Sequence, residues 1–130
     1  MRNNKGETHT FEGLKLWQQC RELRKKVADL TRTFPQDERF RLVDQLLRAS
    51  RSVTANIAEG YGRYHYQENI QFCRQAGGSL YELIDHLSVA LDEGYIDEDK
   101  FNRFRKEALD SVRVLNGYIK YLQNRKDEGS

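Results

Sequence analysis

The chain has 130 residues, 38% of them hydrophobic and 32% charged, with a formal net charge of +2 at pH 7. A chain of this size and composition suits one folded domain, and without a run of about 18 apolar residues it is not expected to span a membrane. The small net charge also falls well short of the strong basic excess that is typical of dedicated nucleic-acid-binding domains.

The N-terminal half of the chain predicts a polar tail and two helices. Residues 1–10 are polar and expected to be disordered, and they lack the apolar core of a signal peptide, so we expect a cytoplasmic protein. Apolar residues then recur at alternating gaps of four and three from about Glu12 to Thr33, which predicts a first helix. Pro35 ends it, because the residue before a proline is pushed out of the helical region. A second helix is predicted from about Gln36 to Gly60, where Gly60 and Gly62 supply a left-handed cap.

Two longer helices are predicted in the C-terminal half. The third runs from about Tyr66 to Glu93 and has Gly77 and Gly78 in its middle. Since each glycine costs a helix about 1 kcal/mol relative to alanine, we expect this pair to mark a tight crossing with another helix. The fourth helix runs from its cap, Asp97, to about Asn124, and residues 125–130 are expected to fray.

Four long amphipathic helices with short connections predict an all-α fold. Helices joined by short loops run in opposite directions, so we expect an up-down-up-down antiparallel four-helix bundle over residues 11–124. No strand-like alternation of polar and apolar residues competes with this interpretation.

A polar stripe runs beside the apolar face of the second helix. At about 100° per residue it lies on the shoulder of that face, where polar groups must be hydrogen-bonded or paired. Three alternatives stay open: an internal network with Ser79 and Glu82 of the third helix, an oligomer contact, or a ligand or nucleic-acid contact. In the internal network one arginine of the stripe pairs with a carboxylate. The stripe consists of Gln45, Arg48, Ser52, Asn56 and Glu59.

No constellation of catalytic residues is evident. The three histidines are isolated, no spacing typical of metal ligands occurs, and no glycine-rich phosphate loop follows a strand. Cys20 and Cys73 fall on apolar helix faces, where we expect them to be buried and unpaired. The sequence therefore predicts a protein that is not an enzyme and that uses neither a metal nor a cofactor.

Charged and aromatic residues are unevenly spread and favour one end of the predicted bundle as a binding surface. Residues 80–99 carry seven acidic and no basic side chains, whereas residues 15–32 and 100–126 are rich in lysine and arginine. The turn between the second and third helices interleaves tyrosines with an arginine, a pattern that suits base stacking but also pads the ends of bundles. Because the C-terminus shares this end, the candidate nucleic-acid contacts are Arg63, Tyr64, Lys120, Arg125 and Lys126.

Four segments together carry a resemblance. They are Phe34-Pro35-x-x-Glu38, Leu42-x-x-Gln45-x-x-Arg48-Ala49, Asn56-Ile57-Ala58-Glu59-Gly60-x-Gly62-Arg63 and Ala76-x-Gly78-Ser79-x-x-Glu82-Leu83. With these segments the chain resembles the 23S rRNA intervening-sequence proteins, a bacterial family of small four-helix bundles. The resemblance implies an up-down bundle that assembles as a ring-like homopentamer. It also implies kinship with bundle proteins that serve reverse transcriptases as accessory factors, binding nucleic acid and the transcriptase.

Two functional hypotheses follow. The first is a non-enzymatic, self-assembling bundle that acts as a nucleic-acid-associated accessory factor, with RNA or DNA and a protein such as a reverse transcriptase as partners. The alternative is a structural or protein-binding oligomeric scaffold with no nucleic-acid role. Both include self-association, because one bundle buries only one face of each helix and large apolar residues remain outside those faces. The remaining residues are Leu14, Trp17, Val43, Leu47, Phe72, Tyr81, Leu109, Tyr118 and Tyr121.

Overall fold

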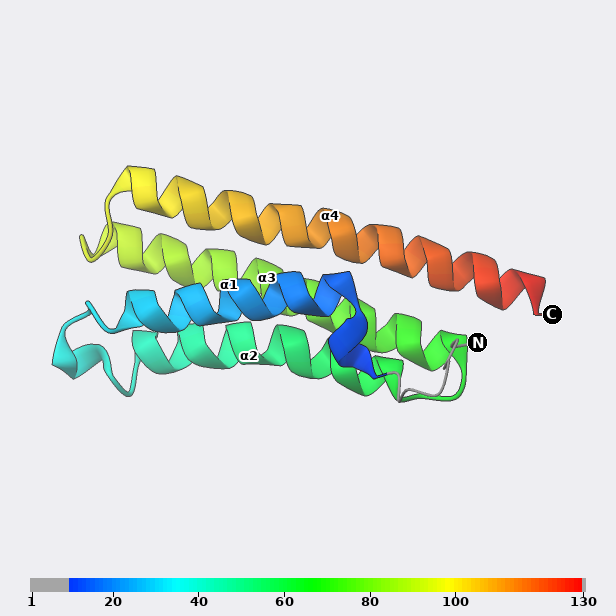
Figure 1. The fold of residues 1–130 in the computed structure, drawn as a ribbon. Coiled ribbons are helices and arrows are strands. Elements are labelled where there is room, and N and C mark those ends of the chain that lie inside the picture. The colour runs from blue at the N-terminus through cyan, green and yellow to red at the C-terminus, as the bar shows by residue number, and fades with distance from the viewer. Residues whose placement is uncertain (1–9, 130) are drawn as a thin grey trace.

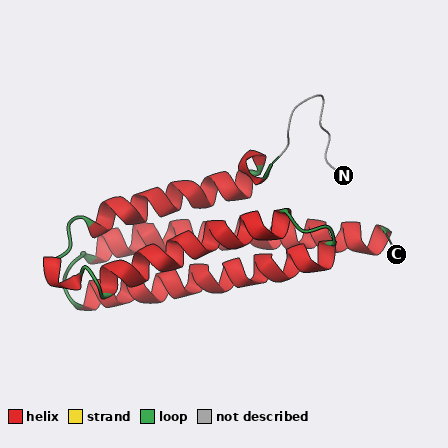
Figure 2. Cartoon of the chain, turned by 90° about the horizontal axis from the view of Figure 1, so that it is seen from below, coloured by secondary structure: helices red, strands yellow, loops and turns green. Residues whose placement is uncertain are grey.

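The computed structural model describes residues 10–129, which form four long helices and no strand. In chain order the elements are η1 (Phe11–Gly13), α1 (Lys15–Thr31), η2 (Gln36–Glu38), α2 (Leu42–Tyr61), α3 (Tyr66–Asp92) and α4 (Glu98–Glu128), where η marks a short 3-10 helix. The long helices run alternately in opposite directions, and α4 reaches past the start of α1 (Figure 1, Figure 2). The predicted all-α, up-down-up-down four-helix bundle is therefore confirmed. The expectation for residues 1–10 lies, apart from Thr10, outside the described residues.

The apolar faces predicted from the sequence meet in one core. On α1 every residue of the predicted apolar seam is buried. α2 packs along much of α3, and α3 along α4, whereas α1 and α4 touch over a shorter stretch. Two polar bridges span that stretch, from Gln19 Nε2 to Ser111 Oγ at 3.3 Å and from Lys26 Nζ to Glu107 Oε1 at 2.9 Å. None of the described helices has the length and apolar character needed to cross a membrane.

The start of α2 differs from the prediction. Residues 36–38 form a separate 3-10 turn, and the backbone of Arg41, with φ −120° and ψ −104°, interrupts the chain before the helix begins at Leu42. The Glu38 carboxylate accounts for this break. Its Oε1 accepts a hydrogen bond from the Leu42 backbone N–H at 3.3 Å, and its Oε2 accepts one from the Tyr95 hydroxyl at 2.5 Å. One carboxylate thus satisfies a free N–H at the positive end of α2 and ties the α1–α2 connection to the α3–α4 connection.

The end of α4 also differs from the prediction. Residues 125–128, expected to fray with the rest of the tail, continue the helix. Two contacts with the start of α3 hold them: Arg125 forms a hydrogen bond with Tyr66, and Lys126 Nζ donates to Gln67 Oε1 at 2.7 Å. The polar composition of the tail predicted fraying, but specific partners on a neighbouring helix order it.

The tight crossing predicted at Gly77 and Gly78 is wrong for Gly78. A Cβ built on Gly78 meets no atom within 4 Å, so this glycine faces open space. A Cβ on Gly77 meets Leu115 Cδ2 of α4 at 3.3 Å, which is the far end of a flexible side chain. The pair therefore does not mark a point where two backbones must touch.

The close approach lies at Gly60, in the last turn of α2. A Cβ on Gly60 would lie 2.6 Å from Asn69 Oδ1 and 2.9 Å from Phe72 Cβ, both on α3. Gly60 is thus the residue that lets α2 and α3 converge before their connecting turn. Gly62, predicted to form a left-handed cap, has φ −78° and ends the helix in a right-handed conformation instead.

Candidate functional site

The polar stripe of α2 joins α3 through two serines. Ser52 Oγ and Ser79 Oγ lie 2.9 Å apart, and Asn56 Nδ2 donates to the Ser52 carbonyl at 2.9 Å and to Ser52 Oγ at 3.1 Å. Ser79 is buried, while Ser52 and Asn56 are half-buried. These groups satisfy one another at the edge of the core, as the internal-network interpretation predicts, and they help to fix the register of α2 against α3.

The charged side chains of the stripe, and Glu82 of α3, contact partners on their own helices. The pairs are Arg48 with Asp44 at 3.6 Å, Glu59 with Arg63 at 2.9 Å, and Glu82 with His86 at 3.2 Å. A carboxylate partner for Arg48 was expected, but the expected bonds from Glu59 and Glu82 across the helix interface are wrong. Residues four apart on one helix surface are neighbours, so these exposed side chains find partners without crossing to another helix. Gln45 is exposed at the outer end of the stripe.

The turn between α2 and α3 presents an open tyrosine. Tyr64 is 92% exposed, and its ring meets His65 edge-on, with 4.9 Å between the ring centroids. The guanidinium carbon of Arg63 lies 4.9 Å from the centroid of the Phe72 ring, while its Nη2 pairs with Glu59. The turn therefore combines an accessible aromatic ring with a guanidinium whose charge is already compensated.

The C-terminal part of α4 reaches the same end of the bundle (Figure 1), and it carries the three other predicted cations, Lys120, Arg125 and Lys126. Lys120 is exposed and has no ion-pair partner within the described part of the chain. The hydrogen bond from Arg125 to Tyr66 raises the pKa of that guanidinium, and Arg125 Nη1 also lies 3.4 Å from Glu128 Oε1. The C-terminal turns of α4 and the α2–α3 turn thus bring the five predicted nucleic-acid contacts to one end of the bundle.

The two thiols are unreactive at neutral pH. Cys20 and Cys73 are free and buried, as predicted. Burial raises the pKa of Cys20 to about 11, despite a hydrogen bond with Ser111 that opposes the shift, and raises the pKa of Cys73 to about 12. Both side chains therefore stay protonated and are poor nucleophiles. Residues 10–129 contain no group of three or more His, Cys, Asp or Glu side chains placed to hold a metal ion.

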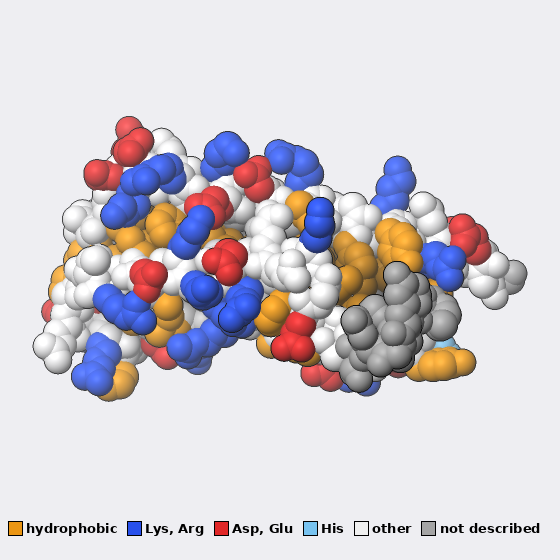
Figure 3. Space-filling view, viewed as in Figure 1, with side chains coloured by type: hydrophobic (Ala, Val, Ile, Leu, Met, Phe, Trp, Pro, Cys, Tyr) orange, Lys and Arg blue, Asp and Glu red, His pale blue; other side chains and the backbone are white. Residues whose placement is uncertain are grey.

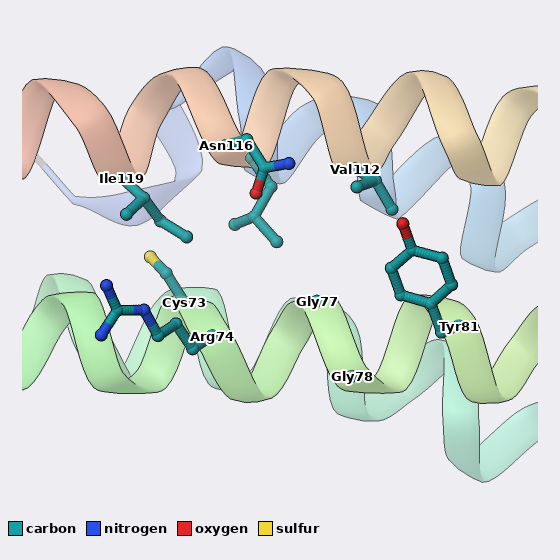
Figure 4. A pocket seen from close by; sticks show the side chains of 9 residues that line it. Cys73, Arg74, Gly77, Gly78, Tyr81, Val112, Asn116 and Ile119 are labelled. Carbon is teal, nitrogen blue, oxygen red and sulfur yellow. The ribbon is translucent and has the colours of Figure 1, made fainter.

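A groove of about 380 Å³ runs between α3 and α4 on the side that faces away from α1 and α2 (Figure 4). Its floor is apolar, and Arg74, Tyr81 and Asn116 stand at its rim. The sequence placed Tyr81 among the residues left outside the core, but it did not reveal the groove. The floor consists of Cys73, Gly77, Val112, Leu115 and Ile119, which the heptad pattern assigns to the core.

Comparison with known proteins identifies the family. The family model described as 23S rRNA-intervening sequence protein matches residues 12–117. The chain belongs to this family. A solved structure of a protein of unknown function from the S23 ribosomal protein family of Bacteroides thetaiotaomicron is 19% identical, with a TM-score of 0.74, over 81% of this chain and 98% of that chain. At that identity the likeness shows the fold alone. A search of curated proteins found no match.

Only some of the candidate nucleic-acid contacts lie within the segment that the 23S rRNA-intervening sequence model matches. It includes Arg63 and Tyr64 in the α2–α3 turn but ends before Lys120. It also includes α1, whose half-buried Trp17 and basic side chains were not among the predicted contacts. The excess of basic residues over 15–32 was the signal that pointed to them.

Proposed function

We propose that this member of the 23S rRNA-intervening sequence family is a non-enzymatic, self-assembling four-helix bundle that acts as a nucleic-acid-associated accessory factor. The observation that carries the proposal is the exposed Tyr64 ring in the α2–α3 turn, at the end of the bundle that the C-terminal turns of α4 also reach with their cations. Exposed aromatic rings stack with unpaired bases, and neighbouring lysine and arginine side chains contact phosphates. An RNA with a single-stranded loop is the ligand that this combination suits best.

A non-enzymatic role is supported by the chemistry of the nucleophiles. The pKa values of about 11 and about 12 leave Cys20 and Cys73 protonated and buried. Ser52 and Ser79 bond to each other, so neither is held by a histidine that takes its proton. The groups that carry covalent catalysis in other proteins serve packing or helix register here.

The test is a titration of the protein against a short RNA hairpin at about 50 and 200 mM salt, where phosphate contacts predict a steep loss of affinity. The variant Tyr64→Ala with Lys120→Glu removes an exposed ring and an unpaired cation from the candidate end. The matched control, Phe40→Ala with Arg39→Glu, removes an 84% exposed ring and a neighbouring cation from the opposite end. We expect the first variant to bind about 5-fold or more weakly, which is the loss of one stacked base, and the control to bind as the wild type.

Two results of this experiment would contradict the proposal. If the wild type binds neither the hairpin nor the corresponding DNA at about 50 mM salt, the nucleic-acid role is wrong. If both variants bind as the wild type, the protein binds nucleic acid elsewhere and the α2–α3 end is not the contact.

The second candidate function, a structural or protein-binding oligomer without a nucleic-acid role, is favoured by the α3–α4 groove. An apolar floor beside Tyr81, which is 57% exposed, is typical of a surface that another protein covers. Both candidates include self-association, and the family resemblance implies that five copies of the chain assemble into a homopentamer. Sedimentation velocity at micromolar concentration tests this, and a single monomeric species contradicts it.

A further inference from the structure

The one tryptophan of the chain lies beneath two arginines on α1. The guanidinium carbons of Arg21 and Arg24 lie 5.8 and 6.0 Å from the centroid of the Trp17 ring, and Phe11 meets that ring edge-on at 5.0 Å. Trp17, Arg21 and Arg24 line a hollow of about 590 Å³ together with Glu12, Gln18 and Glu22. Each guanidinium is within cation–π range of the ring, which limits the orientations that the two long side chains adopt.

The guanidinium groups of this cluster have spare donors. Arg24 Nη1 donates to Thr54 Oγ1 of α2 at 2.9 Å, which uses one of the five N–H donors that an arginine carries. Arg51 lies one helical turn before Thr54 and is exposed, so it borders the same side of α2. Within the described residues no ion pair joins Arg21, Arg24 or Arg51 to a carboxylate. We call these three residues, with Trp17, the α1–α2 basic cluster.

Neither carboxylate that lines the hollow forms an ion pair with an arginine of the cluster. Glu22 Oε2 lies 3.7 Å from Lys25 Nζ, and Glu12 Oε1 accepts a hydrogen bond from Thr10 Oγ1 at 2.9 Å. Figure 3 shows the resulting gathering of lysine and arginine side chains over the middle of the face formed by α1 and α2. At the α2–α3 end, in contrast, Arg63 and Arg125 each have a carboxylate partner. The arginines of the α1–α2 basic cluster therefore differ from Arg63 and Arg125 in having no carboxylate partner within the described residues.

We propose that the α1–α2 basic cluster is a phosphate-binding surface that contacts the backbone of the nucleic acid. The inference rests on the proposed function and assigns it a second contact. The planar guanidinium fork matches two phosphate oxygens at once, and arginines three residues apart on one helix face present two such forks side by side. The aromatic ring beneath them adds an apolar surface of the kind that nucleic-acid sites combine with arginine. An acidic protein segment is the competing partner, and the experiment separates the two.

Trp17 makes the proposal testable in the unmodified protein. Because it is the only tryptophan, its emission reports on the surroundings of this cluster, and the variants described below separate a contact at the cluster from one at the neighbouring α2–α3 end. The RNA hairpin is titrated into the wild-type protein while tryptophan emission and RNA anisotropy are followed together. We expect the emission to change with the same midpoint as RNA binding. A poly-glutamate peptide, titrated in the same way, represents the acidic protein partner.

A pair of variants measures the number of phosphate contacts. Arg21→Glu with Arg24→Glu is expected to lower the slope of log affinity against log salt by about 2, which is about 1 for each phosphate contact. The control, Arg39→Glu with Arg105→Glu, makes the same change in net charge at two exposed arginines that also have no ion pair within the described residues. It is expected to leave the slope unchanged. Circular dichroism confirms the fold of each variant, and the emission of the wild type decides the question if one of them unfolds.

The outcomes separate this inference from the proposed function. RNA binding with an unchanged Trp17 emission, or with equal salt slopes for the two variants, overturns the inference and leaves the proposed function standing. Absence of RNA binding overturns both. An emission change with poly-glutamate but not with RNA replaces the nucleic acid by an acidic protein and also overturns the inference.

Discussion

Gly60 is the position at which one added methyl group tests the packing of the bundle most directly. In Gly60→Ala the new Cβ would lie 2.6 Å from Asn69 Oδ1, 2.9 Å from Phe72 Cβ and 3.1 Å from the Asn69 carbonyl oxygen. The Asn69 side chain is buried, and its amide forms hydrogen bonds with Tyr118 and Cys73 that a rotation would break. The other two atoms belong to, or sit directly on, the backbone of α3, so the helix itself must move away from α2.

The magnitude follows from two opposing effects. Overpacking costs about 1–3 kcal/mol, and two short contacts to atoms fixed by the backbone place this site near the upper value. Alanine in place of glycine inside a helix raises the free energy of unfolding by about 1 kcal/mol. The net loss is therefore about 2 kcal/mol. With an unfolding entropy of about 2.1 cal/mol/K per residue, the chain of 130 residues loses about 7 °C in Tm.

Gly78→Ala is the matched control, because it adds the same methyl group to a helix at a position with no atom within 4 Å. Here only the helix propensity changes, so we expect a gain of about 1 kcal/mol, or about 4 °C in Tm. Both variants are melted by circular dichroism at one low protein concentration, since association alters Tm. A rise in Tm for Gly60→Ala would refute the close approach of α2 and α3 at this residue.

Three further perturbations test other parts of the molecule. Leu80→Asp places an unpaired carboxylate at a fully buried position, which costs several kcal/mol. Circular dichroism should therefore show an unfolded chain. A folded variant would show that the register of α3 is wrong. Ser52→Ala and Ser79→Ala should each cost about 1 kcal/mol by urea denaturation and less than the sum together, since both remove one shared hydrogen bond. The hydrogen bond to Glu38 raises the pKa of Tyr95 to about 12, so its contribution to stability is complete below about pH 10 and is lost as pH rises towards 12. Tyr95→Phe should remove that pH dependence, and identical urea midpoints against pH for both proteins would contradict it.

The fold was predictable because each helix carries its own signal. The apolar seam of α1 is buried throughout, and Asp97 caps α4 by accepting a hydrogen bond from the Lys100 N–H at 2.8 Å, as the sequence predicted. These features depend on spacing within one helix. Where the prediction was wrong, at the start of α2 and the end of α4, a distant partner decides the boundary. Tyr95 forms a hydrogen bond with Glu38, and Tyr66 forms one with Arg125. The two partners of each pair lie far apart in the sequence, so no local pattern predicts their contact.

The sequence predicted which residues make up the candidate site. It did not predict which of its cations form ion pairs with carboxylates. Sequence reasoning placed Arg63 and Arg125 correctly at one end of the bundle, but it did not consider which carboxylates pair with them. Their carboxylate partners, Glu59 and Glu128, are three or four residues away on the same helix and were visible in the sequence. Which cations remain unpaired depends on every neighbouring helix at once, so the basic excess over residues 15–32 was visible in the sequence, but the pairing state of its arginines and the contact of Arg24 with Thr54 were not.

The two proposed surfaces lie on opposite sides of the bundle, which leads to one more prediction. The groove opens between α3 and α4, with α1 and α2 behind it (Figure 4), whereas the basic cluster lies over α1 and α2. Self-association through the groove would therefore leave the Trp17 ring accessible to nucleic acid. Tyr81→Arg puts a charge at the groove rim and should reduce the sedimentation coefficient while the Trp17 emission still responds to RNA. Arg21→Glu with Arg24→Glu should do the reverse, keeping the assembly and losing the response. A variant that abolishes both properties while remaining folded would show that assembly and nucleic-acid binding share one surface.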